Sequence, residues 1–400
     1  MTYRTYRTHK CCSILLLLTV TAFAREPIPA PPKIVRARDL GIAFNGTPGK
    51  FNAITDVPGV EVGFTTLISG DGKLDPGKGP VRTGVTAILP RGLSGMNDSV
   101  FAGYFSLNGN GEMTGTAWVE ESGFLEGPIL LTNTHSVGVV RDAVIAWRVA
   151  HGGSNEWELP LVAETWDGWL NDLNGFHVKP EHVAHAIETA HGGAIEEGSV
   201  GGGTGMICYE FKGGTGTASR VVSLPVAAVA ERNSSEEKRF TIGVLVQANC
   251  GRRPQLTIRG VEIGKKIPGA VYKKENGSII IVIATDAPLL PHQLKRLARR
   301  ASLGLARTGS VSGNGSGDLF IAFSTANPHA ADSSPPTRTI ETMPNDLMDP
   351  LFTATVEATE EAIINALVDN HDMTGRDDHK VLALPHDRLQ QLLREYNRSR

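Results

Sequence analysis

The stretch NGSIIIVIAT, residues 276–285, decides the fold of this chain. Its Asn-Gly pair is a turn signal, and the β-branched apolar run after it is typical of a strand buried on both faces. Ser278 is the first residue of the expected strand. A serine in this place commonly does no more than open a strand, so any chemical role for it depends on the rest of the chain.

Short strands and helices are expected on both sides of this stretch. Upstream, the apolar patterns predict strands at 84–89, 127–132, 206–211, 220–224 and 242–247, and helices at 141–150 and 180–191. Downstream, they predict an amphipathic helix at 291–305, a strand at 319–324, a loop at 325–348, a long helix capped by Asp349-Pro350 and a terminal helix at 385–396. This mixture indicates an α/β or α+β protein with stacked layers.

The composition is that of a soluble globular protein. Of 400 residues, 40% are hydrophobic and 20% are charged, which is enough for one large core. The 45 glycines gather in clusters such as residues 201–205, a pattern that indicates tight turns and close backbone approaches. No linker separates two independently folding halves.

The N-terminus has the features of a secretory signal peptide. Basic residues precede an apolar run at 13–21, which ends at an Ala22-Phe23-Ala24 cleavage signal. The run is too short to span a membrane. We therefore expect a leader at residues 1–24, a proline-rich tether at 25–37 within a single catalytic domain spanning 25–400, and a secreted or periplasmic location.

Charge and cysteine content narrow the possible partners. The leader carries three basic and no acidic residues, so its removal leaves 36 Lys and Arg against 42 Asp and Glu, a net charge of −6. This balance argues against nucleic-acid or anionic-membrane partners.

After removal of the leader, only two cysteines remain, Cys208 and Cys250. Two are too few for a disulfide-stapled scaffold, and the sequence leaves open whether they pair.

Metal and cofactor sites are not expected. The histidines form no HExxH motif and no paired His/Cys spacing that would indicate zinc. The glycine cluster at 201–205 lacks the lysine of a phosphate-binding loop. Residues 313–318 carry a single carboxylate, too few for a calcium loop. A G-x-S-x-G nucleophile elbow is also absent.

A serine without a neighbouring histidine needs another base. If Ser278 were the first residue of a chain, its own α-amine, with an ordinary pKa of about 8, could take the hydroxyl proton. Making that terminus requires self-cleavage of the bond before the serine. Gly277 is the residue type that best accepts a strained backbone there.

Six stretches in this order resemble the DmpA-type aminopeptidases, the family of L-aminopeptidase/D-esterases and β-peptidyl aminopeptidases. They are NGNGEMTG (108–115), NTHSVG (133–138), AETWDG (163–168), GGGTGM (201–206), VQAN (246–249) and GSII (277–280). The resemblance implies an αββα sandwich of four layers and self-cleavage at Gly277-Ser278 into an α-chain, 25–277, and a β-chain, 278–400. It also implies that such αβ heterodimers assemble into a homo-oligomer.

The same resemblance implies roles for individual residues. Ser278 becomes the nucleophile and Asn249 an amide donor to the oxyanion, although Asn249 alone reads as an ordinary residue at a strand exit. Ser316 and Asp318 would orient the serine and its amine. Asp318 stands where some relatives carry the longer glutamate.

Three further residues are expected to bind substrate. Glu164 would pair with the substrate's free amine, and this pair would favour aminopeptidase over endopeptidase activity. Trp166 stands where some relatives have a tyrosine that reaches the oxyanion. Trp169 would line the same pocket or belong to the core.

We therefore expect a self-processing serine aminopeptidase that releases small N-terminal residues from peptides, amides or esters through an acyl-enzyme, with no cofactor. Preference among L-, D- and β-amino acids stays open. Two alternatives remain at this stage: an acyltransferase of related architecture, whose known relatives use threonine, and a secreted binding protein that is never cleaved.

Overall fold

The computed structural model describes residues 1–2, 35–153, 157–225, 237–271 and 277–398. Residues 34–400 belong to one compact unit. The predicted leader lies outside the described residues, apart from its first two. No helix within the described ranges is long and apolar enough to cross a membrane.

The predicted central strand is strand β11 (Ser278–Thr285), and all of its residues are buried. Its side chains alternate between two cores. Ile279, Ile281 and Ile283 pack into the cluster that includes the helices α5 (Pro291–Arg307) and α6 (Asp349–Val368). Ile280 and Val282 pack into a second cluster, which lies between two sheets. The prediction of a strand buried on both faces is confirmed.

Strand β11 lies inside a six-stranded sheet. The order is β4 (Phe124–Leu125), β3 (Val100–Ser106), β12 (Asp318–Ser324), β11, β10 (Glu237–Asn249) and β9 (Gly214–Pro225). Antiparallel pairing with β10 sets Ser278 opposite Asn249, and parallel pairing with β12 sets Ile279 opposite Asp318. Three residues far apart in sequence therefore meet at one end of the sheet.

A four-stranded sheet packs against the first. Its order is β1 (Glu61–Ser69), β2 (Val81–Leu89), β5 (Ile129–Asn133) and β6 (Leu161–Thr165). Strands β5 and β6 run parallel, and Thr132 pairs with Glu164. Because β6 also contacts β11, this pairing brings the end of β6 close to the start of the central strand.

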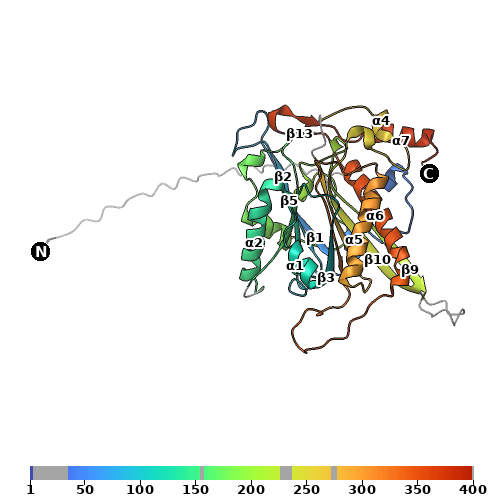
Figure 1. Ribbon diagram of the computed structural model, residues 1–400. Helices are drawn as coiled ribbons and strands as arrows, with labels where there is room; N and C mark the ends of the chain where they lie inside the picture. Colours follow the sequence, from blue (N-terminus) through green and yellow to red (C-terminus); the bar gives the residue numbers. More distant parts are fainter. Residues whose placement is uncertain (3–34, 154–156, 226–236, 272–276, 399–400) are drawn as a thin grey trace. The chain divides into compact units, whose positions relative to one another are not determined.

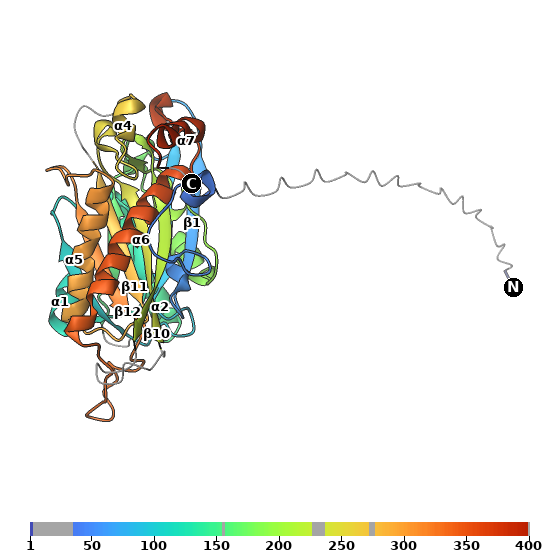
Figure 2. The same cartoon turned by 90° about the vertical axis from the view of Figure 1, so that its right-hand side faces the viewer.

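Helices cover the outer face of each sheet. Helices α2 (Val137–Ala150) and α3 (Pro180–Glu188) pack on the four-stranded sheet through a core that includes Val85, Val140 and Val183. Helices α5 and α6 cover the six-stranded sheet (Figures 1 and 2). The layers are thus αββα, as the resemblance implies. Helix α1 (Thr116–Ser122) packs by β3, and α4 (Ile263–Lys266) and α7 (His386–Glu395) lie at one end of the unit (Figure 1).

Several predicted boundaries differ from the structure. The strand expected at 206–211 is a small hairpin of β7 (Ile207–Cys208) and β8 (Phe211–Lys212), since Tyr209 and Glu210 adopt φ values of 50° and 58° and turn the chain. Helix α2 begins at Val137, before the predicted 141, and α3 ends at Glu188, before the predicted 191. Asp349 is the first residue of α6, so the N-cap position belongs to Met348, which makes no side-chain cap bond.

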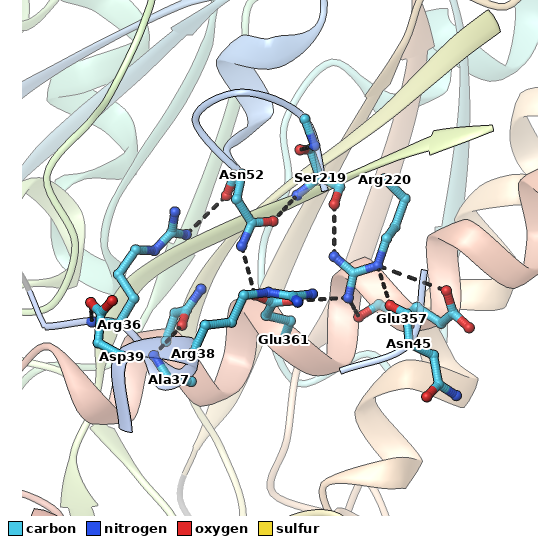
Figure 3. Close-up of polar contacts among 12 residues, drawn as sticks. Arg36, Ala37, Arg38, Asp39, Asn45, Asn52, Ser219, Arg220, Glu357 and Glu361 are labelled. Carbon is cyan, nitrogen blue, oxygen red and sulfur yellow. Dashed lines mark hydrogen bonds and ion pairs between the residues drawn. The ribbon is translucent and has the colours of Figure 1, made fainter. Parts of the chain in front are cut away.

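A buried charge network fastens the N-terminal segment to α6 (Figure 3). The Glu361 carboxylate accepts two hydrogen bonds from Arg38 and one from Arg220, each 2.7 Å long, and one from Asn52 Nδ2 at 2.6 Å. Burial alone would raise the pKa of Glu361, but Arg38 and Arg220 outweigh it and leave the pKa lowered. The network joins a segment that precedes residue 277 to a helix that follows it.

Candidate active site

Ser278 opens β11 at the wall of a cavity. Its side chain is only 6% exposed, and its Oγ accepts a hydrogen bond from the Gly317 N–H at 3.1 Å. This contact fixes the hydroxyl oxygen between the ends of β10, β11 and β12. A buried serine held in this way has the position that a nucleophile needs, at a strand end beside an open space.

Gly277 is enclosed by the backbone of β10. A Cβ added to it would lie 2.0 Å from the carbonyl oxygen of Asn249, closer than side-chain atoms ever approach. Close approach of the backbone therefore requires glycine at this position.

The Asn249 side chain is oriented by two hydrogen bonds. Its Oδ1 accepts from the Ile207 N–H at 2.7 Å, and its Nδ2 donates to the Trp166 carbonyl at 2.9 Å. The first bond fixes which end of the amide carries the nitrogen, and the second uses one of the two N–H hydrogens. The other hydrogen can serve as a donor at the Ser278 end of the sheet.

Ser316 and Asp318 form a buried pair beside the nucleophile. Ser316 Oγ donates to Asp318 Oδ1 at 2.6 Å, and the same oxygen accepts from the Ile279 N–H at 3.2 Å. Burial raises the pKa of Asp318, and hydrogen bonds from Ser316, Ser312, Ile279 and Asn108 oppose that shift. The shorter aspartate therefore does reach Ser316, and it also reaches the residue that follows Ser278.

Asn108 is a site residue to which the sequence analysis gave no role. Its Oδ1 accepts from the Asp318 N–H at 2.6 Å, and its Nδ2 donates to Asp318 Oδ2 at 3.3 Å. Both ends of the amide thus hold one aspartate. The available signal was its place at the start of the 108–115 stretch, which carries part of the resemblance.

Glu164 is the last but one residue of β6 and is buried, with 3% of its surface exposed. Its Oε1 accepts from the Glu112 N–H at 3.0 Å, and its Oε2 accepts from Thr134 Oγ1 at 2.5 Å. Burial raises the pKa of Glu164, while these two hydrogen bonds oppose the shift. Thr134 was another residue without a predicted role, although it lies in the 133–138 stretch.

One cavity joins these parts. It has a volume of about 320 Å³ and is lined by Ser278 and by Asn110, Thr134, Glu164, Trp166 and Gly315. Glu164 and Ser278 therefore face the same space. Trp169 lies elsewhere: its ring stacks on His379 at 4.1 Å, and it packs against the small core of Leu170, Ile207 and Val381. Of the two alternatives for Trp169, the structure favours the core.

No group of three or more His, Cys, Asp or Glu side chains in the described part of the chain is arranged to hold a metal ion. What the site does hold is a buried serine, an oriented amide donor, a serine–aspartate pair and a separate buried carboxylate. Such an arrangement can bind a cationic group at one end of a small cavity and attack a carbonyl at the other.

Comparison with known proteins gives a consistent result. Residues 52–381 match peptidase family S58. Two proteins named beta-peptidyl aminopeptidase BapA are similar along nearly their whole length. That of Sphingosinicella microcystinivorans is 52% identical over 379 residues, 91% of this chain and 93% of that protein. That of Sphingosinicella xenopeptidilytica is 46% identical over 400 residues, 95% of each.

A solved structure agrees with this assignment. The L-aminopeptidase D-Ala-esterase/amidase of Ochrobactrum anthropi, described as a prototype of the serine aminopeptidases and a variant of the Ntn hydrolase fold, superposes with a TM-score of 0.84. It is 47% identical, and the match covers 91% of this chain and 99% of that one. With this fold, this site and these relatives, the chain belongs to peptidase family S58 and is a serine aminopeptidase/amidase with an N-terminal nucleophile.

Proposed function

We propose that the chain cuts itself between Gly277 and Ser278 and then uses Ser278 to release small N-terminal residues, β-amino acid residues among them, from peptides, amides and esters. The observation that carries this proposal is the shared cavity. A buried carboxylate, Glu164, and a buried serine, Ser278, lie on the walls of one small space.

The cleavage step needs a nucleophile, a carbonyl group beside it and a residue without a side chain at position 277. Ser278 Oγ would attack the Gly277 carbonyl carbon, the amide nitrogen would leave as the new α-amine, and water would hydrolyse the resulting ester. Close packing of Gly277 on the Asn249 backbone supports this step, because it holds the scissile bond against a fixed strand.

In turnover, the new α-amine would take the Ser278 hydroxyl proton while Oγ attacks the substrate carbonyl. The Asn249 amide would donate to the oxyanion, a contribution of about 3 kcal/mol in comparable sites. Collapse would release the leaving amine with that proton and leave an acyl-enzyme, which water resolves. Asp318, held by Ser316 and Asn108, would keep the α-amine oriented and its cationic form stabilised.

Substrate selection follows from Glu164, which lines the same cavity as Ser278. The Glu164 carboxylate would pair with the substrate ammonium, and a cavity of about 320 Å³ leaves space for a small side chain. The names of the two curated relatives support β-residues as substrates. The predicted leader supports export, and the resemblance supports an oligomer of αβ heterodimers.

Two experiments test this proposal. Ser278→Ala should leave the chain uncut and inactive, whereas the control Ser302→Ala in α5 should be cut and active; full activity of Ser278→Ala would refute the nucleophile. The purified enzyme should release p-nitroaniline from both L-alanyl and β-alanyl p-nitroanilide. Turnover of the L-alanyl substrate alone would refute the β-residue claim, and aminolysis products in place of hydrolysis would favour the acyltransferase alternative.

A further inference from the structure

The two cysteines that follow the predicted leader meet in the core behind the site. Cys208 ends β7 and Cys250 follows β10; both are buried thiols, and their Sγ atoms are 3.7 Å apart. The backbones beside them are joined as well, since the Tyr209 N–H donates to the Cys250 carbonyl at 2.6 Å. Neither thiol takes part in the proposed catalytic chemistry, so their contact calls for its own explanation.

We propose that Cys208 and Cys250 form a disulfide bond when the chain folds in the presence of a disulfide oxidant. The sulfurs, 3.7 Å apart, must approach to about 2.05 Å, so the bond requires the two side chains to turn toward each other. Two thiols lose two protons and two electrons, and a small aliphatic disulfide such as oxidised glutathione accepts them and leaves as two thiols.

This bond would lock the element that orients the oxyanion donor. The Ile207 N–H fixes the Asn249 amide, and Cys208 and Cys250 are the next residues after these two. A covalent link between Cys208 and Cys250 limits how far Ile207 and Asn249, the residues just before them, can move apart. The disulfide would therefore hold β7 against β10 at the point where the amide must stay oriented.

The surroundings determine when the bond can form. Cys208 is 0% and Cys250 is 1% exposed, so an external disulfide reaches them only before β7 packs on β10. Once folded, the crosslink should resist reduction by mild thiols.

Thiol mapping tests the bond itself. The full-length chain is refolded once with an excess of oxidised glutathione and once with dithiothreitol, denatured, treated with N-ethylmaleimide and mapped by mass spectrometry. After the oxidised refolding, residues 208 and 250 should be unlabelled and joined in one crosslinked peptide, and prior reduction should make both label. Full labelling of both after oxidised refolding would overturn the proposal. The result is independent of activity, and Ser278→Ala should give the same map.

Stability tests the consequence. The oxidised wild type should melt about 5 °C or more above the reduced wild type, because the link closes a loop of roughly 40 residues in the unfolded chain. Cys208→Ala, which cannot form the bond, should melt at one temperature under both conditions. Equal melting temperatures for oxidised and reduced wild type would contradict a stabilising disulfide at this position.

Discussion

Replacement of Glu164 by glutamine removes one charge and keeps the shape of the side chain. The wild-type carboxylate is 3% exposed and is held by the Glu112 N–H and by Thr134. In the proposed complex, its charge balances the substrate ammonium. Losing one partner of a desolvated, hydrogen-bonded charge pair costs about 3 kcal/mol, so kcat/KM should fall by roughly 150-fold.

The assay compares one substrate with and without its charge. Wild type should hydrolyse β-alanyl p-nitroanilide far faster than its N-acetyl form, and Glu164→Gln should lose most of that discrimination. Glu112→Gln is the matched control: it removes an exposed carboxylate nearby but keeps the backbone N–H that holds Glu164, so kcat/KM should change less than about threefold. If Glu164→Gln stays within threefold of wild type, Glu164 does not bind the ammonium.

The same residue predicts a pH dependence. Burial raises the pKa of Glu164, and only its ionised form attracts the substrate ammonium. Wild-type kcat/KM should therefore fall as the pH drops through that raised pKa, from a pH higher than an exposed glutamate would require. In the Glu164→Gln variant, this fall of kcat/KM at low pH should be absent. If the variant shows the same fall as the wild type, another group causes it.

Three further substitutions test the other parts of the account. Asn249→Ala removes the proposed oxyanion donor and should lower kcat by about 100-fold at nearly unchanged KM, as measured on processed enzyme; a KM effect alone would contradict that role. Asn108→Ala removes the two hydrogen bonds between Asn108 and Asp318 and should lower kcat by about tenfold and shift the pH profile of kcat. A loss of stability without that shift would make Asn108 merely structural. Glu361→Gln should lower the free energy of unfolding by about 3 kcal/mol, since the buried Arg220 loses the nearer of its two carboxylate partners and keeps only Glu357 at 3.7 Å. Because the pKa of Glu361 is lowered in the folded protein, the wild-type advantage should be present above the unfolded pKa and disappear as the pH falls through the folded one.

Local patterns predicted the elements whose signal lies in a few neighbouring residues. The β-branched run after Ser278 gave β11, and the periodicity of 291–305 gave most of α5. The β7–β8 hairpin was missed because its strands have two residues each and its turn uses Tyr209 and Glu210, which rarely adopt positive φ.

The site could not have been assembled from such patterns. Asn108 and Asp318 are separated by 210 positions, and the hydrogen bonds between them follow from the pairing of β3 with β12. Glu164 comes close to Ser278 because two sheets stack, which no single stretch encodes. Only the resemblance to a family grouped these residues, and it carried no role for Asn108 or Thr134.

The central claim is that Ser278 becomes a chain terminus, and the most direct test is mass spectrometry with N-terminal sequencing of the purified protein under denaturing conditions. The account predicts two polypeptides, one of which begins with Ser278. A single uncut polypeptide that still hydrolyses aminoacyl p-nitroanilides would contradict it.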